Sequence, residues 1–276
     1  MTKTWLITGT SSGFGKELAT IVAKDEDANL IATARNLNDL KYLDQFDQTK
    51  IIKSVVDVTN LDEIKKLSDD IKNSFGTVDV LVNNAGIGYF STIEESDMEQ
   101  VRYMFDVNVF GLANVTNEIL PMMRDQKSGV IINLSSALAL TTLPTMGFYS
   151  ATKYAVEGYS DTLRQEVAKL GIQVMNVEPS GARTEWSGRS SMKSIPKIAD
   201  YLQFSDSVSS VSDSVHDAPG DPKLIAKVIF DQVTTKKNLP KHLPLGEFAY
   251  NGSLSNLKNM VSEIEKNQSI SLSTDD

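Results

Sequence analysis

The sequence predicts an α/β fold with a single doubly wound parallel sheet and helices on both faces. Short apolar runs alternate along the chain with longer segments that carry apolar residues at helical spacing. The short runs are continuously apolar, which suits strands covered on both faces, as they are in a parallel sheet. Strands that alternate with helices form right-handed βαβ units, and such units build a sheet of this kind.

The predicted strands are typified by Val130-Ile131-Ile132-Asn133-Leu134, an apolar run with one polar residue. Six strands are expected in the first two thirds of the chain, and a short final strand is expected at His242-Leu243-Pro244-Leu245. The six are Trp5–Thr8, Asn29–Thr33, Ile51–Val56, Val78–Asn83, Gly129–Leu134 and Ile172–Val177.

The predicted helices are typified by Leu61–Phe75, where apolar residues recur every three or four positions. Thr59-Asn60-Leu61-Asp62-Glu63 begins this helix with a capping residue and first-turn acids. The other predicted helices are Phe14–Lys24, Met98–Asn117, Tyr149–Leu170, Asp221–Thr235 and Glu247–Lys266.

The regular pattern weakens after Pro179. The serine-rich segment Ser187–Asp217 lacks a long apolar stripe, so we expect a substrate loop at about 187–217 with one short helix at roughly Ile195–Phe204. A C-terminal extension follows at about 247–276, and its polar end, Asn267–Asp276, is expected to fray.

The composition excludes several classes of protein. The chain has 276 residues and a formal net charge of −9, so it lacks the positive surface of a nucleic-acid-binding protein. It has no cysteine and two histidines, His216 and His242, which excludes disulfides, a thiolate nucleophile and a cysteine- or histidine-rich metal centre. No apolar run approaches the ~18 residues of a membrane span, and the N-terminus lacks a signal-peptide core. We therefore expect a cytoplasmic protein without a membrane partner.

A glycine-rich turn lies between the first strand and the first helix. Thr8-Gly9-Thr10-Ser11-Ser12-Gly13-Phe14-Gly15 has the spacing G-x-x-x-G-x-G, and its strand–turn–helix context favours dinucleotide binding. Glycine lets backbone N–H groups approach a pyrophosphate, and the helix N-terminus supplies partial positive charge. The alternative is a glycine-rich turn that binds nothing.

The end of the second predicted strand indicates which nucleotide would bind. Folds that bind NAD place an acid about 20 residues after the glycine turn, where it binds the ribose 2′-hydroxyl. This chain has Ala34-Arg35 there, and an arginine can pair with a 2′-phosphate. The sequence therefore predicts NADP(H) in preference to NAD(H), although Arg35 could also be an ordinary surface residue.

A tyrosine and a lysine stand four residues apart in Tyr149-Ser150-Ala151-Thr152-Lys153, so a helix places them on one face. A nearby ammonium favours the phenolate and lowers the pKa of Tyr149, which suits a general acid–base. The alternative is that Tyr149 and Lys153 are an ordinary pair on a helix surface.

Two further polar residues stand at informative positions. Ser136 follows a predicted strand, and Asn108 interrupts an apolar helix and would be buried. Serine at the carboxyl end of a parallel strand lies where such sheets bind ligands.

These motifs, in this order, resemble the short-chain dehydrogenase/reductase family over about residues 3–260. The resemblance is to its NADP-preferring, bacterial-type branch and implies a Rossmann-like fold. It also implies that Tyr149 donates or accepts the proton and that Ser136 holds the substrate oxygen. Lys153 would bind the nicotinamide ribose and lower the pKa of Tyr149, and Asn108 would hold a water in a proton relay.

The resemblance also implies a set of cofactor-binding residues along the sheet edge. Asp57 and Val58 would contact the adenine, Asn84 the adenosine ribose, and Thr184 the nicotinamide amide or the phosphate. The full set is Gly9, Ser11, Ser12, Gly13, Phe14, Gly15, Arg35, Asp57, Val58, Asn84, Ala85, Gly86, Tyr149, Lys153, Pro179, Gly181 and Thr184. The family pattern is Pro-Gly after the sixth strand, whereas this chain has Pro179-Ser180-Gly181, so Ser180 could tighten or rotate the nicotinamide edge.

Together these residues predict an NADP(H)-dependent oxidoreductase that transfers hydride between nicotinamide and a carbonyl or secondary alcohol. An apolar substrate pocket is expected from six residues, although many could be ordinary packing. They are Leu138, Leu140, Leu143, Met146, Trp186 and Met192. An NADP(H)-binding sensor with little turnover is the main alternative, and an epimerase or dehydratase on the same fold is another. A Ser/His/Asp hydrolase is excluded because there is no G-x-S-x-G motif.

The cofactor and catalytic motifs alternate along one sheet, so we expect a single dinucleotide-binding catalytic domain over residues 1–276. The partner implied is a small carbonyl or alcohol. The family's usual dimer face uses the helices placed here at Met98–Arg124 and Tyr149–Leu170. We therefore expect a homodimer or homotetramer.

Overall fold

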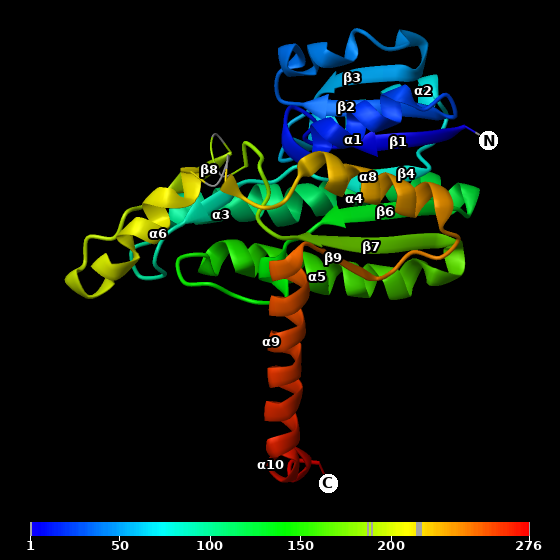
Figure 1. The fold of residues 1–276 in the computed structure, drawn as a ribbon. Helices are drawn as coiled ribbons and strands as arrows, with labels where there is room; N and C mark the ends of the chain where they lie inside the picture. The colour runs from blue at the N-terminus through cyan, green and yellow to red at the C-terminus, as the bar shows by residue number, and fades with distance from the viewer. Residues whose placement is uncertain (1, 187, 189, 214–216, 276) are drawn as a thin grey trace.

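The computed structural model describes residues 2–186, 188, 190–213 and 217–275. A seven-stranded sheet runs through it, and every neighbouring pair of strands is parallel (Figure 1). In spatial order the strands are β3 (Ile51–Val55), β2 (Ala28–Ala34), β1 (Lys3–Ile7), β4 (Val80–Asn83), β6 (Gly129–Leu134), β7 (Ile172–Pro179) and β9 (His242–Leu245). The order reverses between β1 and β4, which makes this the switch point where doubly wound sheets bind ligands.

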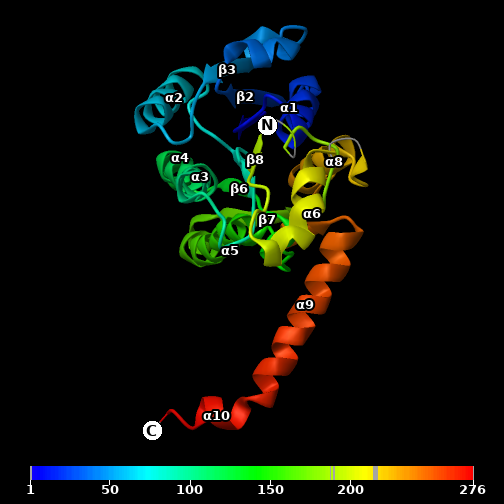
Figure 2. The same cartoon turned by 90° about the vertical axis from the view of Figure 1, so that its left-hand side faces the viewer.

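Helices cover both faces of the sheet (Figure 2). One face carries α2 (Leu61–Ser74), α4 (Leu112–Gln126) and α5 (Gly147–Val167), and the other carries α1 (Gly13–Lys24) and α8 (Pro222–Thr235). Strand side chains alternate between two buried apolar clusters, so Leu6 packs on the first face while Trp5 and Ile7 pack on the second. The predicted fold class is therefore confirmed.

Shorter 3₁₀ segments connect these elements. They are Leu37–Leu43, Gln48–Lys50, Ala137–Ala139, Ala168–Leu170, Ala199–Phe204 and Ser210–Asp213. Helix starts follow the capping chemistry of the sequence. The Asn60 side chain accepts hydrogen bonds from the first N–H groups of α2, and Asp221 caps α8 ahead of Pro222.

The predicted helix Met98–Asn117 is not one uniform helix. It consists of α3 (Met98–Phe105), a π-helical segment (Asp106–Gly111) and α4. The wider turn adds a residue to the helix, and such segments are frequent at functional sites. Asn108 lies inside this segment and is buried, as predicted.

The expected substrate loop is more ordered than the sequence indicated. A strand, β8 (Ser191–Lys193), pairs with β5 (Gly88–Phe90) in a separate two-stranded parallel sheet that the sequence did not predict. The short helix expected at Ile195–Phe204 is present as 3₁₀ from Ala199, followed by α6 (Ser205–Ser209). The rest of the loop includes His216, which lies outside the described residues.

The last long helix, α9 (Glu247–Lys266), has the predicted bounds and projects away from the sheet (Figures 1 and 2). The segment expected to fray contains a further short helix, α10 (Gln268–Leu272). Among the described residues, no helix combines the length and apolar character needed to cross a membrane.

Candidate active site

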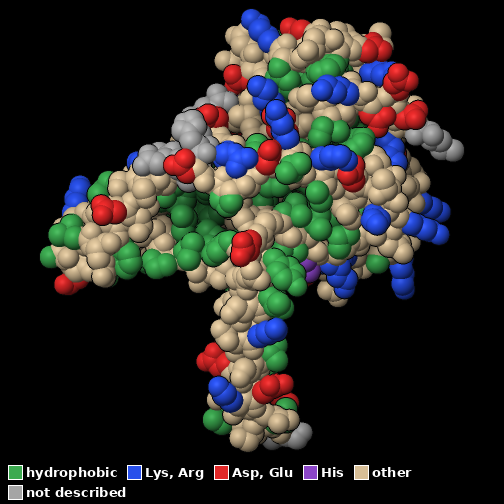
Figure 3. Space-filling view, viewed as in Figure 1, with side chains coloured by type: hydrophobic (Ala, Val, Ile, Leu, Met, Phe, Trp, Pro, Cys, Tyr) green, Lys and Arg blue, Asp and Glu red, His purple; other side chains and the backbone are tan. Residues whose placement is uncertain are grey.

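The carboxyl ends of β1, β2, β3, β4, β6 and β7 border one cavity of about 530 Å³. Figure 3 shows apolar side chains gathered in a hollow beside the base of α9. All but two of the predicted site residues line this cavity; the exceptions are Gly15 and Asn108. The parallel topology brings them together because it gathers every strand's carboxyl end at one edge.

The glycine turn needs glycine for conformational and steric reasons. Gly9 and Gly13 adopt φ values of +67° and +56°, which favour glycine. A Cβ on Gly15 would lie 2.6 Å from the carbonyl oxygen of Gly9, and a Cβ on Gly13 would lie 3.2 Å from Cβ of Thr184. The turn is therefore compact. Gly15 does not line the cavity, but its missing side chain lets the turn pack closely on Gly9.

Asn84 holds the glycine turn against the end of β4. Its side-chain Nδ2 donates to the carbonyl oxygens of Thr8 and Gly9, at 2.9 Å each. The Thr8 hydroxyl accepts from the backbone N–H groups of Asn84 and Ala85. The Asn84 side chain therefore holds the glycine turn in position.

Arg35 is exposed at the end of β2, and its Nη1 lies 3.4 Å from the Tyr103 hydroxyl. Within the described part of the chain no carboxylate forms an ion pair with Arg35. Asp57 follows β3, and its carboxylate accepts from the N–H and hydroxyl of Thr59. The guanidinium at the rim thus remains available for an anion.

Tyr149 lies in the first turn of α5 and is only 6% exposed. Its ring packs against the Trp186 ring at a centroid distance of 4.8 Å. Burial raises the pKa of the Tyr149 phenol well above its usual value, while a hydrogen bond with the Ser136 hydroxyl opposes that rise. The pKa of Tyr149 is therefore raised rather than lowered toward neutrality, because burial outweighs the Ser136 hydrogen bond.

Lys153 lies one turn after Tyr149, and its Nζ is 5.8 Å from the centre of the Tyr149 ring. The ammonium donates to the carbonyl oxygen of Leu134 at 2.7 Å. Burial lowers the pKa of Lys153 to about 8, and the Glu157 carboxylate acts in the opposite direction. A substantial fraction of Lys153 is therefore charged at neutral pH.

Asn108 lies behind the cavity and positions its wall. Its Oδ1 accepts from the N–H of Ile87 at 2.8 Å, and its Nδ2 donates to the Ile87 carbonyl at 2.9 Å. The same Nδ2 contacts the Thr152 hydroxyl, which donates to the carbonyl of Tyr149. Asn108 is thus linked to the helical turn that carries the tyrosine.

Ser180 has a role that the sequence did not indicate. Its Oγ accepts from the N–H of Ala249 in the first turn of α9 at 2.8 Å, and its N–H donates to Leu245. It therefore supplies α9 with the cap that Gly246, at the N-cap position, cannot provide. Ser180 lines the cavity, so it links the cavity edge directly to the C-terminal helix.

Of the six apolar residues expected in the substrate pocket, Leu138, Leu143, Met146 and Trp186 line the cavity, whereas Leu140 and Met192 do not. Sequence reasoning missed several other lining residues. Those brought from distant elements are Tyr103, Val107, Ser207, Ser210, Val211 and Phe248. They carry no motif, and only tertiary packing places them here.

A family model for short chain dehydrogenases matches residues 3–194 of this chain. An oxidoreductase of Botryotinia fuckeliana is 33% identical over 251 residues, which cover 89% of each chain. A solved short-chain dehydrogenase from Streptomyces avermitilis has a TM-score of 0.89 and 32% identity, covering 100% of this chain and 99% of its own. The solved structure of ElxO with NADP bound has a TM-score of 0.74 and 27% identity, covering 91% of this chain and 99% of its own.

The parallel sheet, the cavity at its switch point and these similarities lead to one family assignment. The chain is a member of the short-chain dehydrogenase family of oxidoreductases.

Proposed function

We propose that this protein is an NADP(H)-dependent oxidoreductase that interconverts a carbonyl and a secondary alcohol, with Tyr149 as general acid and base. The observation that carries the proposal is the placement of Tyr149, Ser136 and Lys153 on the wall of the cavity that also contains the glycine turn. Proton transfer and dinucleotide binding would thus occur in one space.

The residues present fit a nicotinamide dinucleotide. Gly9 and Gly13 give the turn at the N-terminus of α1 its compact form, since a Cβ on either would press on Ala85 or Thr184. The backbone N–H groups of such a turn can bind a pyrophosphate. The adenosine end would lie near Asp57 and Val58, and the nicotinamide end near Thr184. When bound, the nicotinamide supplies or accepts the hydride.

In the reductive direction, Tyr149 protonates the substrate oxygen. Its raised pKa keeps the phenol protonated at neutral pH, so the proton to be donated is in place. Ser136 hydrogen-bonds the phenol and offers a second contact to the developing alkoxide. Lys153 stabilises the phenolate that remains after donation.

NADP(H) is the proposed cofactor because Arg35 lines the cavity at the end of β2. A guanidinium can pair with a 2′-phosphate through two parallel hydrogen bonds. The solved structure of ElxO, which is 27% identical to this chain, has NADP bound, and this supports the same choice.

The substrate is proposed to be an apolar or aromatic carbonyl compound. The Trp186 ring packs against the Tyr149 ring at a tilt of 52°, and Leu138, Leu143 and Met146 extend the apolar wall. Apolar cavities with a few polar groups at the reacting end favour such ligands.

The test is oxidation of NADPH with aldehydes, ketones, aromatic quinones and steroid ketones, using wild type and Tyr149→Phe. We expect the variant to bind NADPH normally, because the ring is retained, and to lose at least about 100-fold in kcat. Near-normal turnover by a folded Tyr149→Phe variant would overturn the assignment of Tyr149. Tight NADPH binding by wild type without turnover of any carbonyl class would instead indicate a sensor.

A further inference from the structure

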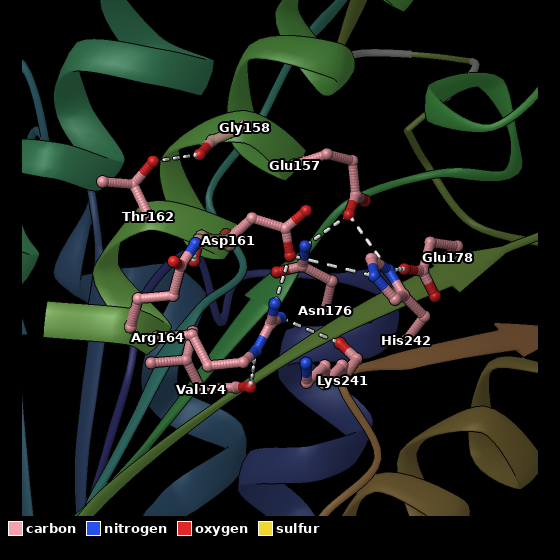
Figure 4. Close-up of polar contacts among 12 residues, drawn as sticks. Glu157, Gly158, Asp161, Thr162, Arg164, Val174, Asn176, Glu178, Lys241 and His242 are labelled. Carbon is pink, nitrogen blue, oxygen red and sulfur yellow. Dashed lines mark hydrogen bonds and ion pairs between the residues drawn. The ribbon is translucent and has the colours of Figure 1, made fainter. Parts of the chain in front are cut away.

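A row of ionisable side chains begins at Lys153 and continues through Glu157 to His242 and Glu178, on the outer strands of the sheet. Figure 4 shows the part of this row from Glu157 onward. Glu157 follows Lys153 by one turn on α5 and is 7% exposed. Nδ1 of His242, on β9, lies 3.3 Å from Oε2 of Glu157 and 3.0 Å from Oε1 of Glu178, on β7. The row thus crosses three elements and ends at the half-exposed imidazole.

The charges along this row alternate. Hydrogen bonds with Glu157 and Glu178 raise the pKa of His242 to about 10, so the imidazole is protonated at neutral pH. His242 then pairs with both buried carboxylates, while Lys153 lies one turn from Glu157 on the same face of α5. A buried charge is tolerated when it is paired; burial raises the pKa of Glu178, and its hydrogen bond with His242 opposes that rise.

Hydrogen bonds fix the carboxylates in this arrangement. The Asn176 side chain donates to Oε2 of Glu157, and the N–H of Leu243 donates to Oε2 of Glu178 at 2.7 Å. The other carboxylate oxygen of Glu157, Oε1, has no hydrogen-bond partner among the described residues. Its charge is therefore only partly neutralised, and its field acts on Lys153 one turn away.

Glu157, Glu178 and His242 also have ligand atoms within 4.8 Å of one another, a spacing that could hold a metal ion. The charge balance argues for an ion-paired row instead. A divalent cation would have to displace the imidazolium proton of His242, which already pairs with both carboxylates.

We propose that Glu157 is a positioning residue that keeps Lys153 positively charged, and that contacts with His242 and Asn176 hold the Glu157 carboxylate in place. This inference deepens the proposed function and rests on it only for the catalytic consequence. Through the row, the charge state beside Tyr149 depends on β9, the strand that leads into α9.

Other charged groups near the row are already paired. Asp161 lies 3.9 Å from Nε2 of His242, but its carboxylate forms an ion pair with Arg164. Arg164 also donates to the carbonyl oxygens of Val174 and Lys241, at 3.0 and 3.1 Å. Asp161 is 52% exposed, so its field on the row is screened. Asp161→Asn is therefore a matched control, because it removes a carboxylate one turn further along α5.

The primary test is the titration of Lys153, observed by NMR in protein carrying ε-¹³C-lysine. Its signal is assigned from its absence in Lys153→Arg. We expect a midpoint near 8 in wild type and a midpoint lower by about one unit or more in Glu157→Gln, because an opposing charge is lost. His242→Gln should shift the midpoint in the same direction by a smaller amount, and Asp161→Asn should leave it in place.

The catalytic arm uses the pH dependence of kcat/KM with an aromatic quinone. The limb at which Lys153 loses its charge should move to lower pH in Glu157→Gln, and Glu157→Asp should restore part of the shift. A merely structural role would lower the rate at every pH without moving that limb.

Unchanged Lys153 midpoints in both Glu157→Gln and His242→Gln would overturn the proposal. If Glu157→Gln does not fold, an unchanged midpoint in His242→Gln overturns it alone. Failure of the proposed enzyme activity is recognised separately, since the Lys153 titration needs no substrate or cofactor.

Discussion

Burial and a neighbouring polar group shift the pKa in opposite directions, both for the phenol of Tyr149 and for the ammonium of Lys153. Burial favours the neutral form of each, whereas Ser136 and Glu157 favour the charged forms. The spacing of Tyr149 and Lys153 on one helical face could be predicted from the sequence. The strength of burial could not, because Trp186 and Leu134 approach them from distant segments.

Arg35 provides a prediction about cofactor preference. In Arg35→Ser, we expect the ratio of kcat/KM for NADPH to that for NADH to fall by about 10- to 100-fold. The reason is the loss of a charge-assisted hydrogen bond worth about 1.5–3 kcal/mol. Steady-state kinetics with both cofactors measures this ratio.

The matched control for that experiment is Lys53→Ser on β3, the strand that pairs with β2. It removes a cation that is paired with Asp44. Its ratio should equal that of wild type. A ratio unchanged in Arg35→Ser as well would mean that Arg35 makes no contact with the 2′-phosphate.

Several elements follow their local sequence closely and others do not. The bounds of β6, β9 and α9 match the predicted ranges, because apolar runs, Gly246 and capping residues define them locally. The pair β5–β8 could not be predicted, since its two three-residue strands form only by pairing across about a hundred residues. The π-helical segment at Asp106–Gly111 was missed because one extra residue per turn leaves the apolar spacing almost unchanged.

The first turn of α9 provides a prediction about local stability. Ser180→Ala removes the oxygen that accepts from the N–H of Ala249, and losing such a cap costs about 1 kcal/mol. We expect amide exchange over residues 246–252 to accelerate by about fivefold, as measured by mass spectrometry. Ser255→Ala, an exposed site on the same helix, should change nothing. Equal exchange in Ser180→Ala and wild type would show that α9 does not depend on this cap.

The strand β9 provides a prediction about the pH dependence of stability. The pKa of His242 is raised from 6.5 to about 10, so the folded state holds this proton more tightly than the unfolded state. The stabilisation is fully present below about pH 6.5 and is lost as the pH rises toward 10. Urea unfolding should therefore show a larger difference between wild type and His242→Gln at pH 6.5 than at pH 10. A constant difference would mean that the imidazolium does not stabilise the fold.

At the scale of the whole molecule, the outer surface of α5 supports the expected self-association. Gly158 faces open space, and Tyr154 on α5 and Phe110 before α4 are exposed aromatic residues. A helical surface with exposed aromatic side chains suits packing against a second copy.

We therefore expect light scattering to give at least the mass of a dimer. Gly158→Arg should reduce it to the monomer, because a Cβ at this position has no neighbouring atom within 4 Å and the longer side chain would obstruct the partner. Asp70→Arg, on the exposed side of α2, should leave the mass unchanged. A monomeric wild type would contradict the expectation. A dimer that survives Gly158→Arg would indicate that the interface lies on α9 instead, where Tyr250, Leu257 and Ile264 are exposed.

The contact between Ser180 and Gly246 has a consequence for engineering this chain. Gly246 has a φ of +101°, and a Cβ there would lie 2.6 Å from Oγ of Ser180. A larger residue at either position would collide with the residue at the other. The two positions therefore have to be changed together, although they are far apart in the sequence. Libraries that alter the cavity edge at 180 should therefore vary 246 in the same clone, and a graft of this C-terminal helix onto a relative should carry both residues.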